Sequence, residues 1–236
     1  MFGFGYGYGY GFDPYIILVI PAFLFSLYAQ FKVKSTFGKY RRIPNSRGLT
    51  GADVARRILD QHGLNDVSVQ RTRGELTDHY DPRTKIVNLS ETVYSSTSVA
   101  AIGVAAHETG HAIQHQVGYA PLALRTNLVP VAGIGSSIGP YMAIFGIIFR
   151  WTPLIYAGII LFTLAVAFYL VTLPVEFNAS RRAIHTLEDS GMLADEELRP
   201  AKKVLSAAAM TYVASAAVAI ASLLRLVLLA NGRRRD

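Results

Sequence analysis

Residues 107–111 read His-Glu-Thr-Gly-His, an HExxH pattern inside an uncharged stretch. If this stretch is helical, one turn separates His107 from His111, so both imidazoles leave the same helix face and can bind one Zn²⁺. Glu108 lies beside them and can hold and deprotonate a water that the metal activates. The pattern also occurs by chance in many proteins, where it marks only a helix with two solvated histidines. The uncharged flanks favour a buried helix, and therefore the first half of a zinc peptidase site.

The third zinc ligand has to come from another part of the chain. The longer pattern HExxHxxGxxH needs Gly at 114 and His at 117, where this chain has Gln114 and Val117. His115 lies one turn further along, but three ligands on one helix spread too far around its axis for a tetrahedral site. We therefore expect His115 to pack near the site or to reach the membrane interface. After His111 the first acidic residue is Glu176, which directly follows an apolar run, where an acid is costly unless it serves a purpose.

We predict that Glu176 is the third ligand, and the alternative is a capping role or an ion pair with Arg181 or Arg182. Ser180 lies one turn after Glu176 and is placed to hydrogen-bond a ligand. Arg181 or Arg182 could stabilise the oxyanion or bind the substrate, or could simply face lipid headgroups. The oxyanion could equally be bound by Tyr80, His79 or His185.

The composition is typical of a membrane protein. Of 236 residues, 51% are hydrophobic and only 17% are charged, whereas charged residues normally make up about a quarter of a soluble domain. The runs that lack any charge are residues 15–31, 128–149, 154–175 and 204–224. Crossing a hydrocarbon core takes about 20 residues, so the last three runs are long enough and the first is at the short end. We predict about four transmembrane helices.

Only residues 150–153 join the second and third of these runs, so the two must form a hairpin. That hairpin returns Glu176 to the side of the membrane that holds His107 and His111. The expected divisions outside the spans are a Gly/aromatic leader (1–14), a catalytic part with the HExxH helix (32–119), a second catalytic segment (176–203) and a basic tail (225–236).

The segment ahead of the motif predicts a small α+β unit. A helix is expected from an N-cap at Thr50 to a stop at Gly63, followed by a strand at 67–71. Segments 76–80 and 85–90 flank the turn sequence at 81–84 and predict a hairpin, hence a small antiparallel sheet. The strand at 85–90 either accepts substrate by edge pairing or is an ordinary covered strand. The expected fold class is a mainly α integral membrane protein with a zincin-like α+β catalytic part.

Charge and cysteine content limit the classes of partner. The chain has no cysteine, which excludes disulfides, thiolate metal sites and a cysteine nucleophile. Its net charge of +7 is not a nucleic-acid signature, because the densest cluster directly follows the first apolar run. That cluster is Lys32, Lys34, Lys39, Arg41, Arg42 and Arg47. It predicts contact with anionic lipid and a cytoplasmic location of the catalytic part. The sequence indicates no particular oligomeric state.

Several segments together resemble the bacterial YugP-like neutral zinc metallopeptidases of the membrane, which are HExxH proteases of the gluzincin type. The segments are 76–84, 89–91, 102–114 and 174–182, and the resemblance covers nearly the whole chain except the leader and the tail. It implies His107, His111 and Glu176 as zinc ligands, Glu108 as the catalytic residue, and proteins or peptides as substrates. It also implies a role in degrading damaged membrane proteins. The chain is distantly similar to heat-shock-type and prenyl-protein membrane metallopeptidases, with Ser180 where those carry Asp.

The predicted function is that of a membrane-bound zinc metalloendopeptidase of the bacterial cell membrane, with Glu108 as general base. One alternative is a non-hydrolytic metal-binding membrane protein or transporter, but the four uncharged runs also contain no His. Another is an intramembrane protease, but the apolar stretch before His107 is short and follows a polar Ser/Thr cluster. Four spans would place Arg233–Arg235 outside, against the positive-inside rule, unless the last run packs in the membrane without crossing it.

Overall fold

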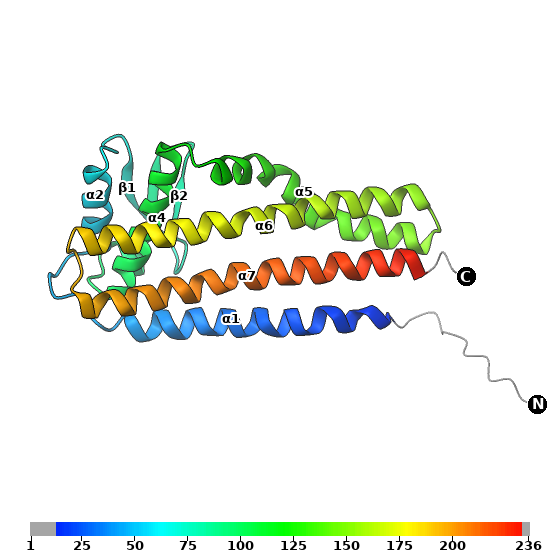
Figure 1. Cartoon of the computed structure of the whole chain (residues 1–236), viewed down its shortest axis with the longest axis horizontal. Coiled ribbons are helices and arrows are strands. Elements are labelled where there is room, and N and C mark those ends of the chain that lie inside the picture. Colours follow the sequence, from blue (N-terminus) through cyan, green and yellow to red (C-terminus); the bar gives the residue numbers. More distant parts are fainter. Residues whose placement is uncertain (1–12, 233–236) are drawn as a thin grey trace, which may run out of the picture.

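The computed structural model describes residues 13–232 (Figure 1). Residues 1–12 and 233–236, which hold most of the expected leader and the arginines that end the expected tail, lie outside the described residues. The elements are η1 (Pro14–Leu18), α1 (Val19–Tyr40), α2 (Gly51–Gln61), β1 (Ser68–Thr72), β2 (His79–Asp81), β3 (Ile86–Ser90), α3 (Glu91–Tyr94), α4 (Val99–Gln116), α5 (Ala120–Ile148), α6 (Thr152–Asp189) and α7 (Asp195–Gly232).

Long helices give the molecule its elongated shape. Figure 1 shows α1, α6 and α7 running along the long axis, with α2, α4 and the strands gathered at one end. Four helical segments in the described part of the chain are long and apolar enough to cross a membrane: 14–40, α5, α6 and α7. The prediction of a mainly helical membrane protein with about four spanning helices is therefore confirmed.

Two of the long helices continue past the apolar runs into the end where α2, α4 and the strands gather, which is the predicted catalytic part and is called the catalytic end below. Helix α6 extends from its apolar run to Asp189, and α7 begins at Asp195, ahead of its own run. Both extensions pack against α4. At the opposite end Arg225 of α7 forms an ion pair with Asp13, so the start of α1 and the end of α7 lie together away from the catalytic part. Segment 176–203 is thus a continuation of two spanning helices.

The sheet has three strands in the order β1-β3-β2. Strands β2 and β3 pair antiparallel, with Tyr80 opposite Val87, which confirms the predicted hairpin. Strand β1 pairs parallel with β3, so the expectation of a wholly antiparallel sheet is wrong. The reason is that β1 and β2 do not pair with each other. The chain forms β2 at a distance from β1, and β3 then returns between them, parallel to β1 and antiparallel to β2. Strand β3 is paired with β1 along its whole length and with β2 over Ile86–Asn88, so it is mainly a covered strand, as the second alternative expected.

Side chains cap the starts of α2 and α4, and the cap at Thr50 is the predicted one. Thr50 and Asp53 form a reciprocal capping box at the start of α2, and the Ser98 side chain accepts a hydrogen bond from Ala101 N at the start of α4. The core of the catalytic end is built from α2, β3, α4 and the ends of α6 and α7. Its largest buried side chains include Ile58, Leu59, Leu89, Ile102 and Leu187. This core holds α4 in place.

Candidate metal centre

Helix α4 presents the two histidines of the HExxH motif to one partner helix. His107 and His111 lie one turn apart, and their rings meet edge to face with centroids 4.8 Å apart. Fourteen residues of α4 are buried, as the uncharged flanks of the motif predicted. The imidazole pair therefore lies on a rigid element inside the core of the catalytic end.

Helix α6 brings Glu176 to the histidines. Glu176 Oε2 lies 3.2 Å from His107 Nε2 and 3.7 Å from His111 Nε2. The close approach of the two helices depends on Gly110 of the motif: a Cβ atom there would lie 2.8 Å from the backbone oxygen of Ala179. A larger residue at 110 would push α6 away, so this glycine sets the distance between the two halves of the site.

The donor set and its spacing fit a zinc ion. The ligand atoms of His107, His111 and Glu176 all lie within 4.8 Å of one another. In a tetrahedral site with bonds of about 2.0–2.2 Å, neighbouring ligand atoms lie about 3.3–3.6 Å apart. The two histidine–carboxylate distances match this range within a few tenths of an ångström. Two imidazoles and a carboxylate also leave a fourth position for water, as catalytic zinc sites do.

Neighbouring side chains orient both imidazoles. Ser180 Oγ lies 3.1 Å from His107 Nδ1, and Gln114 Oε1 lies 3.0 Å from His111 Nδ1. Since the Gln114 oxygen can only accept, His111 Nδ1 carries the proton and Nε2 keeps its lone pair for a metal. Gln114 is itself fixed, because its amide donates to Val175 O and to Asn178 Oδ1 on α6.

Arg125 is part of the site, and the sequence reasoning did not single it out. Its Nη1 lies 3.0 Å from Glu176 Oε1, so one carboxylate oxygen is held by the guanidinium while the other faces the histidines. Arg125 comes from the first turns of α5, ahead of the apolar run at 128–149. One signal could have found it: it is the one Asp, Glu, Lys or Arg between Glu108 and Arg150. Tyr212 of α7 lies close enough to Glu176 and Glu108 for both to act on its phenol electrostatically.

Glu108 differs from Glu176 in its surroundings. Its side chain is buried, and within residues 13–232 no hydrogen bond or ion pair engages its carboxylate. Burial raises the pKa of Glu108 above the usual range for a glutamate. Burial alone would lower the pKa of His111, but the hydrogen bond and charge of Glu176 outweigh it, so the pKa of His111 is raised. The Glu108 carboxylate thus has no partner among the described residues, whereas both oxygens of Glu176 are engaged.

Other residues weighed as site groups lie elsewhere or have other partners. His79 is exposed on β2, and its two ring nitrogens lie 2.9 Å from Thr77 O and 3.2 Å from Asn88 Nδ2, so it ties the hairpin together. Arg182 Nε donates to Asn178 Oδ1, which already binds Gln114. Tyr80 OH lies 2.9 Å from His115 Nδ1, and His185 is paired with Asp189. Arg181 lines a groove between α6 and α7.

A buried HExxH helix that meets a glutamate of a spanning helix is the arrangement expected of a membrane metallopeptidase. Comparison of the sequence with protein families agrees: residues 15–231 match the family described as "Putative neutral zinc metallopeptidase". The chain belongs to this family, so it is an enzyme of the zinc peptidase class with zinc as its cofactor.

A curated relative covers almost the same length. The chain is 51% identical over 220 residues to the "Putative membrane protease YugP" of Bacillus subtilis (strain 168), which is 93% of this chain and 98% of the relative. No solved structure matches the chain.

Proposed function

We propose that the protein is a membrane-bound endopeptidase in which His107, His111 and Glu176 hold zinc and Glu108 is the general base. The observation that carries this proposal is the contrast between the two buried glutamates. Glu176 is held by Arg125 on one oxygen and faces both histidines with the other. Glu108, one residue from His107, keeps its carboxylate unengaged. The first arrangement suits a ligand and the second suits a proton acceptor.

The side chains divide the reaction between them. Zinc bound to the three ligands would polarise the scissile carbonyl and lower the pKa of a water. Glu108 orients the attacking water, takes its proton as the oxygen bonds to the carbonyl carbon, and passes that proton to the leaving amine. Ser180 and Gln114 keep the imidazoles in register during these steps.

The place of the site supports cleavage at the membrane surface. Glu176 and Ser180 lie just beyond the apolar run of α6, and α4 is not among the described helices long and apolar enough to cross a membrane. We therefore propose that its substrates are proteins or peptides that reach the interface, damaged membrane proteins among them.

We place the catalytic part on the cytoplasmic side of a bacterial cell membrane. The end of α1 nearest the catalytic part carries Lys32, Lys34 and Lys39, and Arg41 and Arg42 follow directly after it. Such a cluster beside a spanning helix favours the cytoplasmic face and its anionic lipids. A compartment reporter fused after Asp236 is expected to report the outside, since α7 ends away from the catalytic part.

The test of the mechanism is cleavage of an unfolded protein by the detergent-purified, zinc-loaded enzyme. Wild type is expected to cleave, and Glu108→Gln to retain one zinc per chain while turnover falls by about 10²–10⁴-fold, the usual contribution of a general base. Glu91→Gln, an exposed glutamate on α3, serves as the matched control and should cleave like wild type. Turnover by Glu108→Gln at the wild-type rate would contradict the assigned base.

A further inference from the structure

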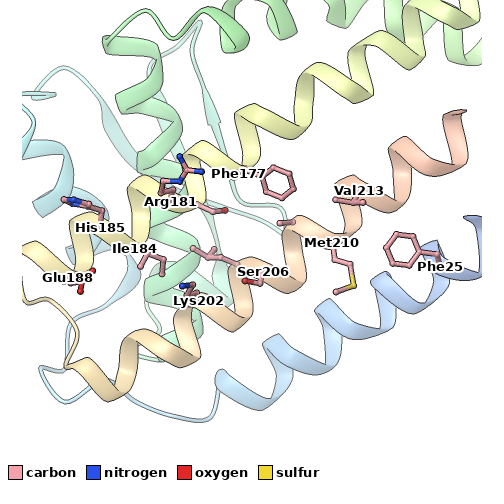
Figure 2. Close-up of a pocket in the computed structure, with 13 residues that line it drawn as sticks. Phe25, Phe177, Arg181, Ile184, His185, Glu188, Lys202, Ser206, Met210 and Val213 are labelled. Carbon is pink, nitrogen blue, oxygen red and sulfur yellow. The ribbon is translucent and has the colours of Figure 1, made fainter.

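A groove of about 620 Å³ runs between α6 and α7 and is separate from the metal ligands, which do not line it. Figure 2 shows its lining side chains from α6 and α7, with Phe25 of α1 at one end. The volume lies within the range of about 300–1,000 Å³ that is usual for sites that bind small molecules.

The groove changes character along its length. Helices α6 and α7 run in opposite directions from the turn at 190–194, so Arg181 and Lys202 lie at a similar distance from it. Both lie just outside the apolar runs. Further along, where α1 approaches, the lining is Phe177, Met210, Val213 and Phe25 (Figure 2). The charged part is therefore at the level of the lipid headgroups and the apolar part at the level of the acyl chains.

The two cations of the groove are not engaged by the protein. Within residues 13–232, neither Arg181 nor Lys202 makes an ion pair or a side-chain hydrogen bond. Glu188, the acidic residue of the lining, is two helical turns beyond Arg181 on the side away from the membrane. His185 is paired with Asp189. Two exposed cations above an apolar channel match a phosphate group that carries acyl chains.

We propose that this groove binds an anionic phospholipid, with its phosphate between Arg181 and Lys202 and an acyl chain over Phe177 and Met210. The site would lie next to the metal centre, because Ser180 lines the groove and its Oγ lies 3.1 Å from His107 Nδ1. A bound headgroup is then separated from a metal ligand by one side chain. The proposal concerns lipid binding alone and does not depend on the catalytic assignment.

The test is native mass spectrometry of the full-length protein in detergent, titrated with phosphatidylglycerol or with phosphatidylcholine of the same acyl chains. Wild type is expected to bind phosphatidylglycerol at least about tenfold more tightly. A basic residue near the lipid phosphates contributes roughly fivefold in affinity, so Arg181→Gln with Lys202→Gln is expected to bind it about thirtyfold more weakly. Ser206→Trp, which fills the groove without changing the charge, should also lose the phospholipid.

The control removes the same charge from the same end of α7. Arg199→Gln with Lys203→Gln, two exposed residues that do not line the groove, should keep wild-type affinity within about threefold. Equal loss in both double variants would show general surface attraction and overturn the site. Equal affinity of wild type for the two lipids would overturn it as well. Unchanged lipid binding in the Arg181/Lys202 variant would also overturn the site. If that variant binds lipid normally but cleaves a membrane-anchored substrate more slowly, the groove holds substrate and not lipid.

Discussion

Helix α6 packs against α5 along its first half and against α4 along its second, and a glycine lies at the closest approach in both contacts. In the membrane half a Cβ at Gly158 would lie 2.4 Å from Ala143 N. In the catalytic half a Cβ at Gly110 would lie 2.8 Å from Ala179 O. The two contacts are alike in closeness and differ in what surrounds them. Large apolar side chains such as Phe145 and Ile160 stay exposed around the first, whereas buried polar groups surround the second.

The difference follows from the two solvents. In lipid, exposed apolar side chains cost nothing, so helices associate through close packing of small residues. The buried cluster there is small and consists of Ala143, Phe162, Ala165, Val166, Ala219 and Leu226. At the catalytic end water drives the burial of large aliphatic side chains, and the closeness of α4 and α6 is used to bring Glu176 to two histidines. Close packing stabilises the helix hairpin at one end and assembles a metal site at the other.

The largest effect is expected where the close approach assembles the site. Gly110→Ala forces α6 away from α4 at Ala179, three residues from Glu176. A displacement on the order of 1 Å can cost about 100-fold in rate, so cleavage should fall by about that factor and zinc binding should weaken with it. The measurements are turnover of an unfolded substrate and zinc content after gel filtration. Wild-type zinc binding in Gly110→Ala would show that the distance between the helices is not set by this glycine.

A smaller effect is expected from the hydrogen bond that α6 makes to a metal ligand. Ser180→Ala removes the hydroxyl beside His107 Nδ1, and the loss of such a supporting group weakens zinc binding by about 10–100-fold. Competition with a zinc chelator measures the affinity. Ser136→Ala, an exposed serine in α5, is the matched control and should leave the affinity unchanged. If Ser180→Ala binds zinc as tightly as the control, Ser180 does not support zinc binding.

Gly158→Ala sharpens the comparison from the membrane side. The added methyl group meets Ala143 N and Gly139 O, both backbone atoms, so the hairpin of α5 and α6 should lose about 1–3 kcal/mol of stability by overpacking. The folded fraction should still cleave within about threefold of wild type, because the metal site lies where the other end of α6 packs against α4. Thermal unfolding in detergent and turnover per folded molecule test this. A 100-fold loss of turnover in well-folded Gly158→Ala would mean that the two contacts are not separable.

The smallest effect lies outside both contacts, at the start of α2. The Asp53 carboxylate accepts hydrogen bonds from Thr50 Oγ1 and Thr50 N, which hold its pKa below the usual value. Because the pKa is lower in the folded than in the unfolded state, the folded state gains stability at pH values above the ordinary pKa of aspartate. This gain in stability is lost as the pH falls through the lowered pKa of the folded state. Thr50→Ala should therefore cost about 1 kcal/mol at pH 7 and less towards pH 3. Thermal unfolding of the metal-free proteins measures the difference, and a cost that grows on acidification would contradict the capping role.

Much of the fold could be predicted from local patterns. Apolar runs predicted the spanning helices, and Thr50 predicted the start of α2, because these signals act within a few residues. The sheet could not be predicted in full, since the pairing of β1 with β3 depends on a crossover and not on alternation. The metal triad could be proposed because HExxH is local and Glu176 is the first acid after it. Arg125 and Gln114 were missed because their roles depend on contacts with α6, 51 and 61 residues away in sequence.

The most direct test of the account is the zinc content of Glu176→Gln beside Glu108→Gln, measured on purified full-length protein by native mass spectrometry. The amide keeps the size of the side chain but removes the charge that faces the two histidines and Arg125. We predict that Glu108→Gln keeps one zinc per chain and that Glu176→Gln loses it under the same conditions, with both proteins still folded. One tightly bound zinc in Glu176→Gln would contradict the claim that α4 and α6 build the metal site together.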